Sequence, residues 1–544
     1  MYSIPARDTQ IKILAHTPLR RILVLAVLFS LPACLAINSA VLSESIQNNT
    51  DFWWHLRTGA WIVEHHAVPA TDPFSIVGGD KPWVAYSWLF EVMLYEFYRW
   101  KGMVGAVVFA LLILVGIAVA LHGAIYRRMG GFAAPVALAA AGLYAMARLY
   151  SPRPWLFTFL FFTIELDIIF GVMIDELNER ARRRLWLLPP LFALWANLHI
   201  QFVYGLAVLV LAAATQELSF LTTKLDAGME QASYELRRRL WAVTALSVLA
   251  TFFNPYTWRI YRVVMEVATQ RLPFGIIMEL TRPNFRSPFD YMVVALALFA
   301  AFVLARKTVR GRLFAWMLLI AATSISLRTI RDEWMAVIVA VLLIAAGNAV
   351  RASSPEALPR LQCLATAAIV ALLIFLAANG RGLSNAAMAQ RVASVFPVKA
   401  ADMIAQNKIS GPLFNDFAWG GYLIWELPGL PVSIDSRTNI YGDARIARSL
   451  DTFNCVDGWQ TDPELASANV VVGQVGECLS SALQADPKFE LVYRDEIAVV
   501  FVRRNGFKPT QVAPVRAVGS GLQRLWPSPR DNTNRLEQSK SKEM

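Results

Sequence analysis

Eleven apolar runs divide the first 378 residues, and most are long enough to cross a lipid bilayer as a helix. Of the whole sequence, 56% is hydrophobic and only 17% is charged, with a mean hydropathy of +0.44. A chain with so little charge cannot cover its own surface in water. We therefore predict a polytopic α-helical membrane protein.

The predicted spans are separated by short polar or basic turns. The fifth and seventh runs are the shortest, and either one as a re-entrant segment would change the count. The eleven runs are 22–42, 103–125, 132–150, 155–174, 185–197, 202–218, 240–253, 289–305, 313–327, 334–349 and 361–378.

The basic residues set the expected topology. The net charge of +11 is spread in short clusters between the apolar runs, unlike the single basic face of a nucleic-acid-binding protein. Because Lys and Arg stay on the cytoplasmic side, residues 1–21 are predicted to be cytoplasmic. The transmembrane domain is 22–378, with large external loops at 43–101 and 254–288. An odd number of spans then places everything after 378 outside the cytoplasm.

The C-terminal part changes pattern to short β-type runs and intervening helices. Strands are predicted at 432–435, 470–473, 490–494 and 497–503, with helices at 397–406 and 476–484. Residues 379–504 are therefore predicted to be a small extracytoplasmic α/β domain. The predicted fold class of the whole chain is a membrane helical bundle with this soluble domain. The polar residues 505–544 are expected to be a disordered tail.

Two cysteines, Cys455 and Cys478, lie in this domain. In an oxidising compartment they can form a disulfide, which we slightly favour over two free thiols.

The first external loop contains the most distinctive residues. Thr50 or Asp51 can cap a helix that runs to about residue 65 and carries several tryptophans, which suit a membrane surface. A turn at 71–75 and a second amphipathic helix at 83–99 follow. Asp51 is either the cap or a catalytic carboxylate just outside the first span, and the residues alone favour the cap.

A set of motifs along the chain resembles a known superfamily. The motifs are Asp51-x-Trp53-Trp54-His55-Leu56-x-x-Gly59, Asp72-Pro73-Phe74-Ser75, Trp195-x-Asn197-x-His199, Asn254-Pro255-Tyr256, Trp419-Gly420-Gly421-Tyr422 and Asp435-x-Arg437. They resemble the GT-C superfamily of membrane glycosyltransferases, and more closely a bacterial GT-C-like group with an Asp-x-Trp-Trp-His motif in the first loop and a C-terminal external domain.

The resemblance implies a hexosyl- or pentosyl-type transferase in the bacterial inner (plasma) membrane. It implies a polyprenyl-phosphate sugar donor and an extracytoplasmic glycan, lipid or protein acceptor. Asp51 would be the general base and the reaction would invert the anomeric carbon, with Glu44 as a second choice. The loop has no Asp-x-Asp motif, so no metal or other cofactor is predicted.

The donor phosphate requires fixed cations, and arginine binds phosphate oxygens in pairs. Contact with lipid headgroups is the competing role, and for any single arginine it is the favoured one. The candidates at the external ends of the spans are Arg148, Arg153, Arg282, Arg286, Arg328 and Arg331.

Other polar residues are candidates for substrate binding. His55 lies one helical turn after Asp51 and can orient it or contact phosphate. The acidic residues Glu165 and Asp167 of the fourth span should bind substrate or pair with an intramembrane cation. Trp419 offers either a surface for sugar rings or part of a structural turn, and the turn is favoured. His199 can face the same cavity or satisfy backbone groups in its turn, and Asp435 and Arg437 can bind acceptor hydroxyls or pair with each other. The remaining candidates are Arg57 and Asp72.

Three other functions stay open. A transporter or flippase of lipid-linked glycans would require paired repeats and broken helices, and no convincing repeat is visible. A ligase would move a whole glycan from undecaprenyl pyrophosphate. A non-catalytic scaffold would keep only the shape of the superfamily.

Overall fold

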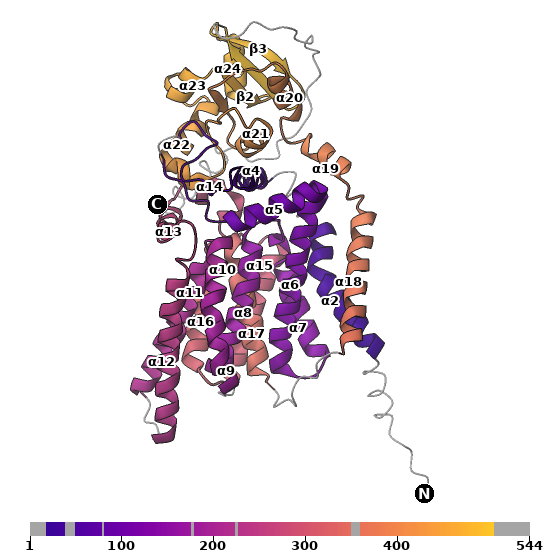
Figure 1. Ribbon diagram of the computed structural model, residues 1–544, viewed down its shortest axis with the longest axis vertical. Coiled ribbons are helices and arrows are strands. Elements are labelled where there is room, and N and C mark those ends of the chain that lie inside the picture. The colour runs from indigo at the N-terminus through magenta and orange to yellow at the C-terminus, as the bar shows by residue number, and fades with distance from the viewer. Residues whose placement is uncertain are drawn as a thin grey trace, which may run out of the picture. The chain divides into compact units, whose positions relative to one another are not determined.

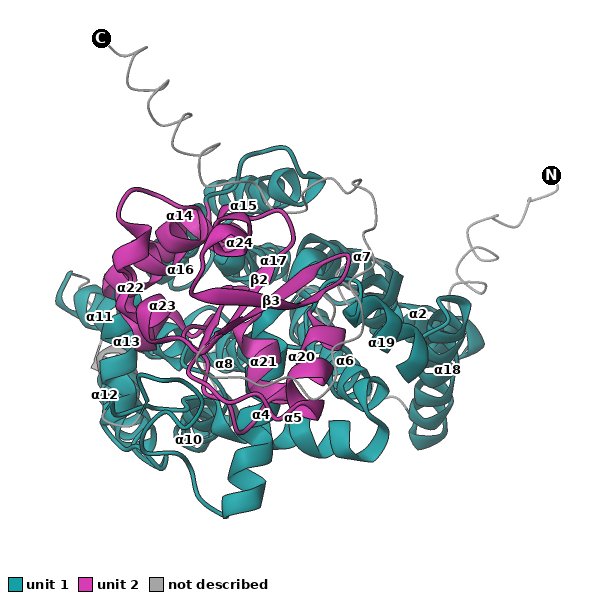
Figure 2. Ribbon diagram, turned by 90° about the horizontal axis from the view of Figure 1, so that it is seen from above, with its two compact units in different colours: residues 1–268, 282–396 teal, residues 269–281, 397–544 magenta. Residues whose placement is uncertain are grey.

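The computed structural model describes residues 18–38, 49–78, 81–175, 179–222, 227–349 and 359–504. The chain forms two compact units (Figure 2): unit 1 is 1–268 with 282–396, and unit 2 is 269–281 with 397–544. Glu44, most of the predicted cytoplasmic N-terminus and the predicted tail lie outside the described residues.

Unit 1 is a bundle of helices, and every predicted span is helical in it (Figure 1). Among the residues that the structure describes, six helices are long and apolar enough to cross a membrane, which confirms a multi-pass membrane protein: α2 (Pro18–Asn38), α6 (Met103–Met129), α8 (Trp155–Met173), α11 (Phe202–Thr222), α15 (Pro288–Arg306) and α18 (Arg360–Gly380). The other five are α7 (Ala133–Ala145), α10 (Leu188–Leu198), α12 (Ala227–Ala250), α16 (Arg312–Ser326) and α17 (Glu333–Gly347). The total of eleven spans stays a prediction.

Helix α17 forms the centre of the bundle. Every residue from Glu333 to Ala346 is buried, and α6, α7, α8, α15 and α16 all pack against it. A helix that is apolar on all sides must be surrounded by other helices or lipid. Its sequence, Glu-Trp-Met-Ala-Val-Ile-Val-Ala-Val, therefore specifies the interior of unit 1.

The first loop contains two helices, α4 (Thr50–His65) and α5 (Trp88–Lys101). They pack closely because Gly59 has no side chain: a Cβ there would lie 2.1 Å from the backbone oxygen of Glu91. The second helix starts later than the predicted residue 83, since backbone turns at Val84–Tyr86 and Ala85–Trp88 precede it. Trp53 and Trp54 are buried rather than half exposed, which corrects their expected place at a membrane surface.

Unit 2 has a four-stranded sheet in the order β1 (Leu413–Asn415), β2 (Val470–Gln474), β4 (Ala498–Arg503), β3 (Phe489–Arg494). Strands β1 and β2 are parallel, and the other pairs are antiparallel. The prediction missed β1 and placed a strand at 432–435, where the structure has none. The helices are α14 (Pro273–Ile276), α20 (Val398–Gln406), α21 (Gly420–Glu426), α22 (Thr438–Phe453), α23 (Pro463–Ser467) and α24 (Cys478–Ala485).

Cys455 and Cys478 form a disulfide with a Cα–Cα distance of 5.7 Å, which confirms the favoured pairing. The boundary between the units differs from the predicted 378–379. Helix α19 (Asn385–Val392) belongs to unit 1, because Asn385 binds the backbone of Lys101 and Val104. Residues 269–281 of the second external loop were predicted to be part of the transmembrane domain, but they belong to unit 2. Helix α13 (Arg259–Thr269) precedes them.

Candidate functional site

The carboxylate of Asp51 contacts an arginine and an indole. Arg153 Nη1 lies 3.0 Å from Oδ2, and the indole Nε1 of Trp54 donates to Oδ1 at 3.2 Å. The cap of α4 is Asn49, which accepts a hydrogen bond from the backbone N–H of Asp51, so the predicted capping by Thr50 or Asp51 is wrong. The Asp51 carboxylate therefore does not cap α4 but contacts Arg153 and Trp54.

Arg153 comes from the turn before α8 and links the loop to the bundle. Its Nη2 donates to Asn49 Oδ1 at 2.7 Å, and its guanidinium lies 4.7 Å from the ring centre of Trp155. The side chain of Arg153 is 14% exposed and that of Asp51 is 23% exposed. The pair is therefore partly open to solvent, and an incoming anion can compete for the arginine.

Tyr86 and Arg331 belong to the same electrostatic environment. Burial, followed by the charge of Asp51, raises the pKa of Tyr86 to about 12, so its hydroxyl keeps its proton at neutral pH. The charges of Arg331 and Arg153 act on this phenol in the opposite direction. Among the described residues Arg331 forms no hydrogen bond or ion pair, and its Nε is buried without a partner. A half-buried arginine of this kind can bind an anion.

His199 lies in the turn between α10 and α11. Burial, and then the charge of Arg331, holds the pKa of His199 well below its usual range. Its Nδ1 lies 2.8 Å from the hydroxyl of Thr158, which also accepts a hydrogen bond from Trp195 Nε1 at 3.0 Å. His199 is therefore a neutral side chain beside Arg331. The charge of Arg331 acts on both Tyr86 and His199, and the charges of Asp51 and Arg153 act on Tyr86, so these five residues are grouped as the candidate site.

His55 does not contact Asp51, contrary to one of its two predicted roles. Its Nδ1 lies 2.9 Å from Glu91 Oε1 on α5, and both side chains are buried. The ring of His55 stacks on Trp54 with centroids 3.6 Å apart. His55 thus supports the indole that binds Asp51. Glu91, which the sequence analysis did not single out, is its partner.

Two further motifs fasten the loop to the bundle. Trp88 Nε1 donates to Asn197 Oδ1 at 2.8 Å, and the amide nitrogen of Asn197 donates to the carbonyl of Phe253 at 2.8 Å. The hydroxyl of Tyr256 donates to the carbonyl of Pro69 at 2.9 Å. These bonds connect four segments that are distant in sequence, so they hold the loop in place beside Arg153.

Several predicted binding residues have structural partners instead. Arg57 pairs with Glu64 of the same helix at 3.0 Å. Asp72 accepts hydrogen bonds from the backbone of Phe74 and the hydroxyl of Ser75, which makes it a turn residue. The remaining arginines also stand apart from Asp51: Arg148 pairs with Asp290 and Glu333, while Arg282, Arg286 and Arg328 are exposed.

In unit 2 the predicted binding residues are buried. Arg437 donates to both oxygens of Asp435, at 2.9 and 2.6 Å, and the hydroxyl of Tyr441 donates to the same carboxylate. Trp419 is only 4% exposed. Asp435 and Arg437 thus pair with each other, which was one of their two predicted roles, because buried charges require partners. The backbone N–H of Trp419 donates to the carbonyl of Asp416 just before α21, in agreement with the favoured structural turn.

The acids near Asp51 do not fit a metal site. No group of three His, Cys, Asp or Glu side chains close enough to hold a metal ion occurs in the part of the chain that the structure describes. Asp51 is instead bound to an arginine and an indole, which donate hydrogen bonds and leave no pair of acidic ligands.

Solved structures with the same arrangement identify the fold. The archaeal oligosaccharyltransferase AglB from Archaeoglobus fulgidus, in complex with an inhibitory peptide and a dolichol-phosphate, matches with a TM-score of 0.51 and 12% identity over 83% of this chain and 69% of that one. The same enzyme tethered to an acceptor peptide with the NVT sequon matches with a TM-score of 0.53 and 12% identity, over the same shares of both chains. The fold is GT-C-like.

A third GT-C-like structure is less similar. ArnT from Cupriavidus metallidurans bound to undecaprenyl phosphate has a TM-score of 0.47 and 16% identity over 88% of this chain and 97% of that one. No protein-family model and no curated protein matches the sequence. Of these three structures, the two of AglB support the GT-C-like fold, and activity must be argued from the residues of the site.

Proposed function

We propose that this protein is a glycosyltransferase that moves a sugar from a polyprenyl-phosphate donor to an extracytoplasmic acceptor, with inversion at the anomeric carbon. The observation that supports this most is the ion pair of Asp51 with Arg153 at one end of a GT-C-like bundle, where the charge of Arg331 acts on the same phenol, Tyr86, as the charges of that pair. Such a site provides a base and two cations for a phosphate. The enzyme AglB, which has the same fold, was solved with a dolichol-phosphate.

Asp51 is proposed as the general base. The acceptor hydroxyl oxygen attacks the anomeric carbon while its proton passes to the Asp51 carboxylate. The bond between that carbon and the phosphate oxygen breaks, and the electron pair leaves with polyprenyl phosphate. Because the phosphate is already a good leaving group, no second carboxylic acid is required. One displacement with attack from the opposite side inverts the anomeric carbon.

Arg153 and Arg331 are proposed to bind the donor phosphate. Without a ligand, Arg153 neutralises Asp51 through their 3.0 Å contact. The donor phosphodiester carries one negative charge shared by two oxygens that a guanidinium can bind together, and further negative charge develops on it as the anomeric bond breaks. Donor binding is therefore proposed to draw Arg153 away and to free Asp51 to take a proton. Arg331 needs no exchange of partners, since it has none among the described residues.

The proposed orientation places Asp51 and unit 2 outside the cytoplasm. The disulfide between Cys455 and Cys478 supports an oxidising compartment for unit 2. At the opposite end of α8, Asp167 binds Arg127, Arg128 and Arg184, and a basic end is expected to face the cytoplasm. The predicted pairing of Asp167 with cations is confirmed, whereas Glu165 is buried without a hydrogen-bond partner among the described residues.

The experiment is a transfer assay with the purified full-length protein and radiolabelled polyprenyl-phosphate sugars. We expect label to move to an envelope acceptor, and we expect EDTA to leave the rate unchanged. Transfer only from a pyrophosphate-linked glycan would instead identify a ligase. Movement of intact donor across vesicles without product would identify a flippase. Absence of all three activities in a folded protein would leave a scaffold and overturn the proposal.

A further inference from the structure

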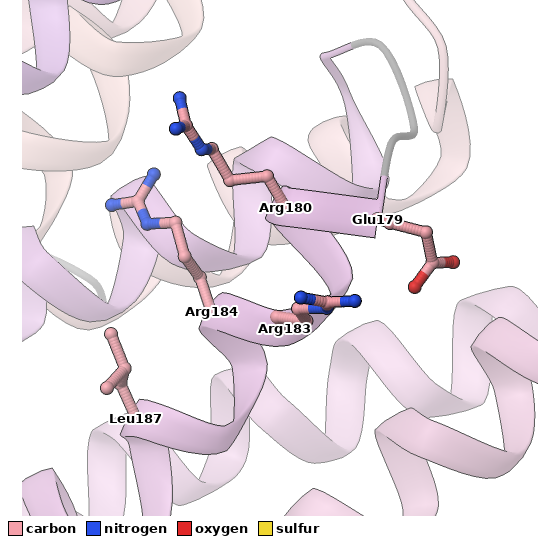
Figure 3. A pocket seen from close by; sticks show the side chains of 5 residues that line it. All are labelled: Glu179, Arg180, Arg183, Arg184 and Leu187. Carbon is pink, nitrogen blue, oxygen red and sulfur yellow. The ribbon is translucent and has the colours of Figure 1, made fainter.

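A second polar site lies at the other end of the bundle from Asp51. Helix α9 (Glu179–Arg184) joins α8 to α10 and lines a cavity of about 490 Å³ with Glu179, Arg180, Arg183, Arg184 and Leu187. Figure 3 shows these five side chains. Ligand pockets in proteins commonly measure roughly 300–1,000 Å³. The cavity is thus large enough for a small polar headgroup.

The charges of this cavity are strongly unequal. Arg180 and Arg183 are exposed, and neither forms an ion pair with any other described residue. Glu179, the single acid of the lining, is turned to other partners: it binds Arg182 at 2.8 Å and Arg239 at 3.4 Å. The carboxylate therefore does not neutralise Arg180 or Arg183, and the cavity is a site for an anion.

Arg184 is the fixed member of the group. Its Nη2 lies 2.6 Å from Oδ2 of Asp167, a carboxylate that also binds Arg127 and Arg128. Asp175 also binds Arg128, so three arginines face two aspartates and excess positive charge remains at this end of α8. Arg180 and Arg184 are one helical turn apart and project from the same side of α9 (Figure 3). Their guanidinium groups can approach one anion together.

The cavity opens onto an apolar strip. Helix α9 continues without a break through the 3₁₀ turn Leu185–Leu187 into α10. Leu187 and Leu194 are exposed and Leu191 is half exposed, at the four- and three-residue spacing that puts side chains on one helix face. Arg180 and Arg184 precede this strip at the same spacing. One helix face thus passes from guanidinium groups to leucines, and Trp186 beside it is exposed as well.

We propose that this cavity binds the phosphate of an anionic phospholipid, with an acyl chain along the leucine strip. A soluble anion would need the arginines alone, whereas the adjoining exposed leucines fit the hydrocarbon part of a membrane lipid. Basic pockets between helices at a bilayer surface recognise anionic headgroups in this way. The position of the cavity agrees with a lipid site at the bilayer surface, since α10 is one of the predicted spans and α9 lies at its basic end.

The site is independent of the proposed transferase site. Arg153 precedes α8 and Asp167 lies near its other end, about 20 Å away along the helix. Loss of lipid binding would leave the general base and the phosphate arginines in place. Failure of this inference therefore says nothing against the glycosyltransferase proposal, and the reverse is also true.

The test measures binding of phosphatidylglycerol to the purified full-length protein by native mass spectrometry in mixed micelles, with phosphatidylcholine as the neutral comparison. We expect preference for phosphatidylglycerol in the wild type. The double variant Arg180→Gln with Arg183→Gln should lose about 30-fold in apparent affinity, because each arginine near an anionic lipid contributes about five-fold. Inorganic phosphate in the same buffer should fail to displace the lipid.

A matched control removes two other exposed cations from the same end. Lys307→Gln with Arg312→Gln changes the net charge equally but leaves the cavity intact, so we expect unchanged affinity. Leu187→Asn keeps every arginine. It should weaken the binding of phosphatidylglycerol and leave the binding of phosphatidylcholine unchanged. Equal binding of both lipids, an equal loss in the control variant, or full displacement by inorganic phosphate would each overturn the proposal.

Discussion

Two aspartate–arginine pairs in this molecule have opposite surroundings. The pair Asp51–Arg153 joins the loop helix α4 to the start of α8, and both side chains are partly exposed. The pair Asp435–Arg437 lies two residues apart in unit 2, and both side chains are 1% exposed or less. A partly hydrated pair can exchange partners with a ligand, whereas a buried one is costly to break. Motif membership alone therefore does not indicate a binding role.

The largest expected effect is on catalysis at Asp51. Asp51→Asn keeps the hydrogen bond from Trp54 but removes the proton acceptor, so transfer should fall at least about 10³-fold, within the usual range for a lost general base. The initial rate with saturating donor measures this, together with expression and thermal unfolding of the variant. A rate within a few-fold of wild type would remove Asp51 as the base.

The buried pair should give a large effect on stability instead. Arg437→Met removes the cation that pairs with the buried Asp435 carboxylate and leaves it the hydroxyl of Tyr441 as its side-chain partner. The change should destabilise unit 2 by about 3–5 kcal/mol. Hydrogen exchange of β2 and β4 reports this directly.

The control for that change is the exposed pair Arg262–Glu266. Arg262→Met should alter stability by no more than about 0.5 kcal/mol. Arg437→Met could instead leave the stability of unit 2 unchanged and abolish transfer. In that case the buried pair has a functional role, and the contrast between the two pairs is wrong.

Substitution of Arg331 tests whether the site around Asp51 binds phosphate. Arg331→Gln should lower kcat/KM by about 10²-fold, as for the loss of one donor to a developing negative charge, with little change in stability. Arg328→Gln, three residues earlier and exposed, should change kcat/KM by less than about three-fold. Similar losses in both variants would indicate a general surface-charge effect and not a phosphate site.

Gly59 tests whether the packing of the loop maintains the site. Gly59→Ala places a Cβ 2.1 Å from the backbone oxygen of Glu91 and should destabilise unit 1 by about 1–3 kcal/mol while lowering transfer. Gly380→Ala, where a Cβ meets nothing within 4 Å, should be neutral or slightly stabilising. Thermal unfolding compares the two variants, and an unaffected Gly59 variant would contradict the proposed close packing.

The smallest effect concerns pH and unit 2. Burial, and then the charge of Asp416, raises the pKa of Glu477 from 4.5 to about 9. Its neutral form is therefore favoured by folding, and that stability is present below pH 4.5 and lost as the pH rises toward 9. Glu477→Gln should match wild type at pH 5 and unfold about 2–4 °C higher at pH 8. Parallel melting curves at both pH values would refute this.

Part of the fold follows directly from the sequence. The apolar runs became helices because helical hydrogen bonding is the way a single apolar segment satisfies its backbone in lipid. Three of the four strands lie where the alternation pattern indicated, and the first-loop helix begins at Thr50 although its cap is Asn49 and not one of the predicted residues. The prediction missed β1 (Leu413–Asn415) because that short strand is defined by its parallel partner β2, and it placed a strand at 432–435 where the structure has none.

The candidate site was predicted only in part. Asp51, His199, Arg153 and Arg331 were all selected, but so were the buried Asp435 and the turn residue Asp72. Glu91, which pairs with His55, and Tyr86, which shares the charges around Asp51, were missed. No local pattern marks either residue, since each acquires its role from side chains on other helices.

Composition and hydrophobic patterning determined that this chain lies in a membrane, forms helices there and has a separate C-terminal domain, because burial of apolar surface depends mainly on local sequence. Only the tertiary structure decided which charges meet. Asn49 and Arg153 are separated by 104 residues, yet their side chains are 2.7 Å apart. Such contacts depend on how the helices pack, and packing is a property of the whole fold.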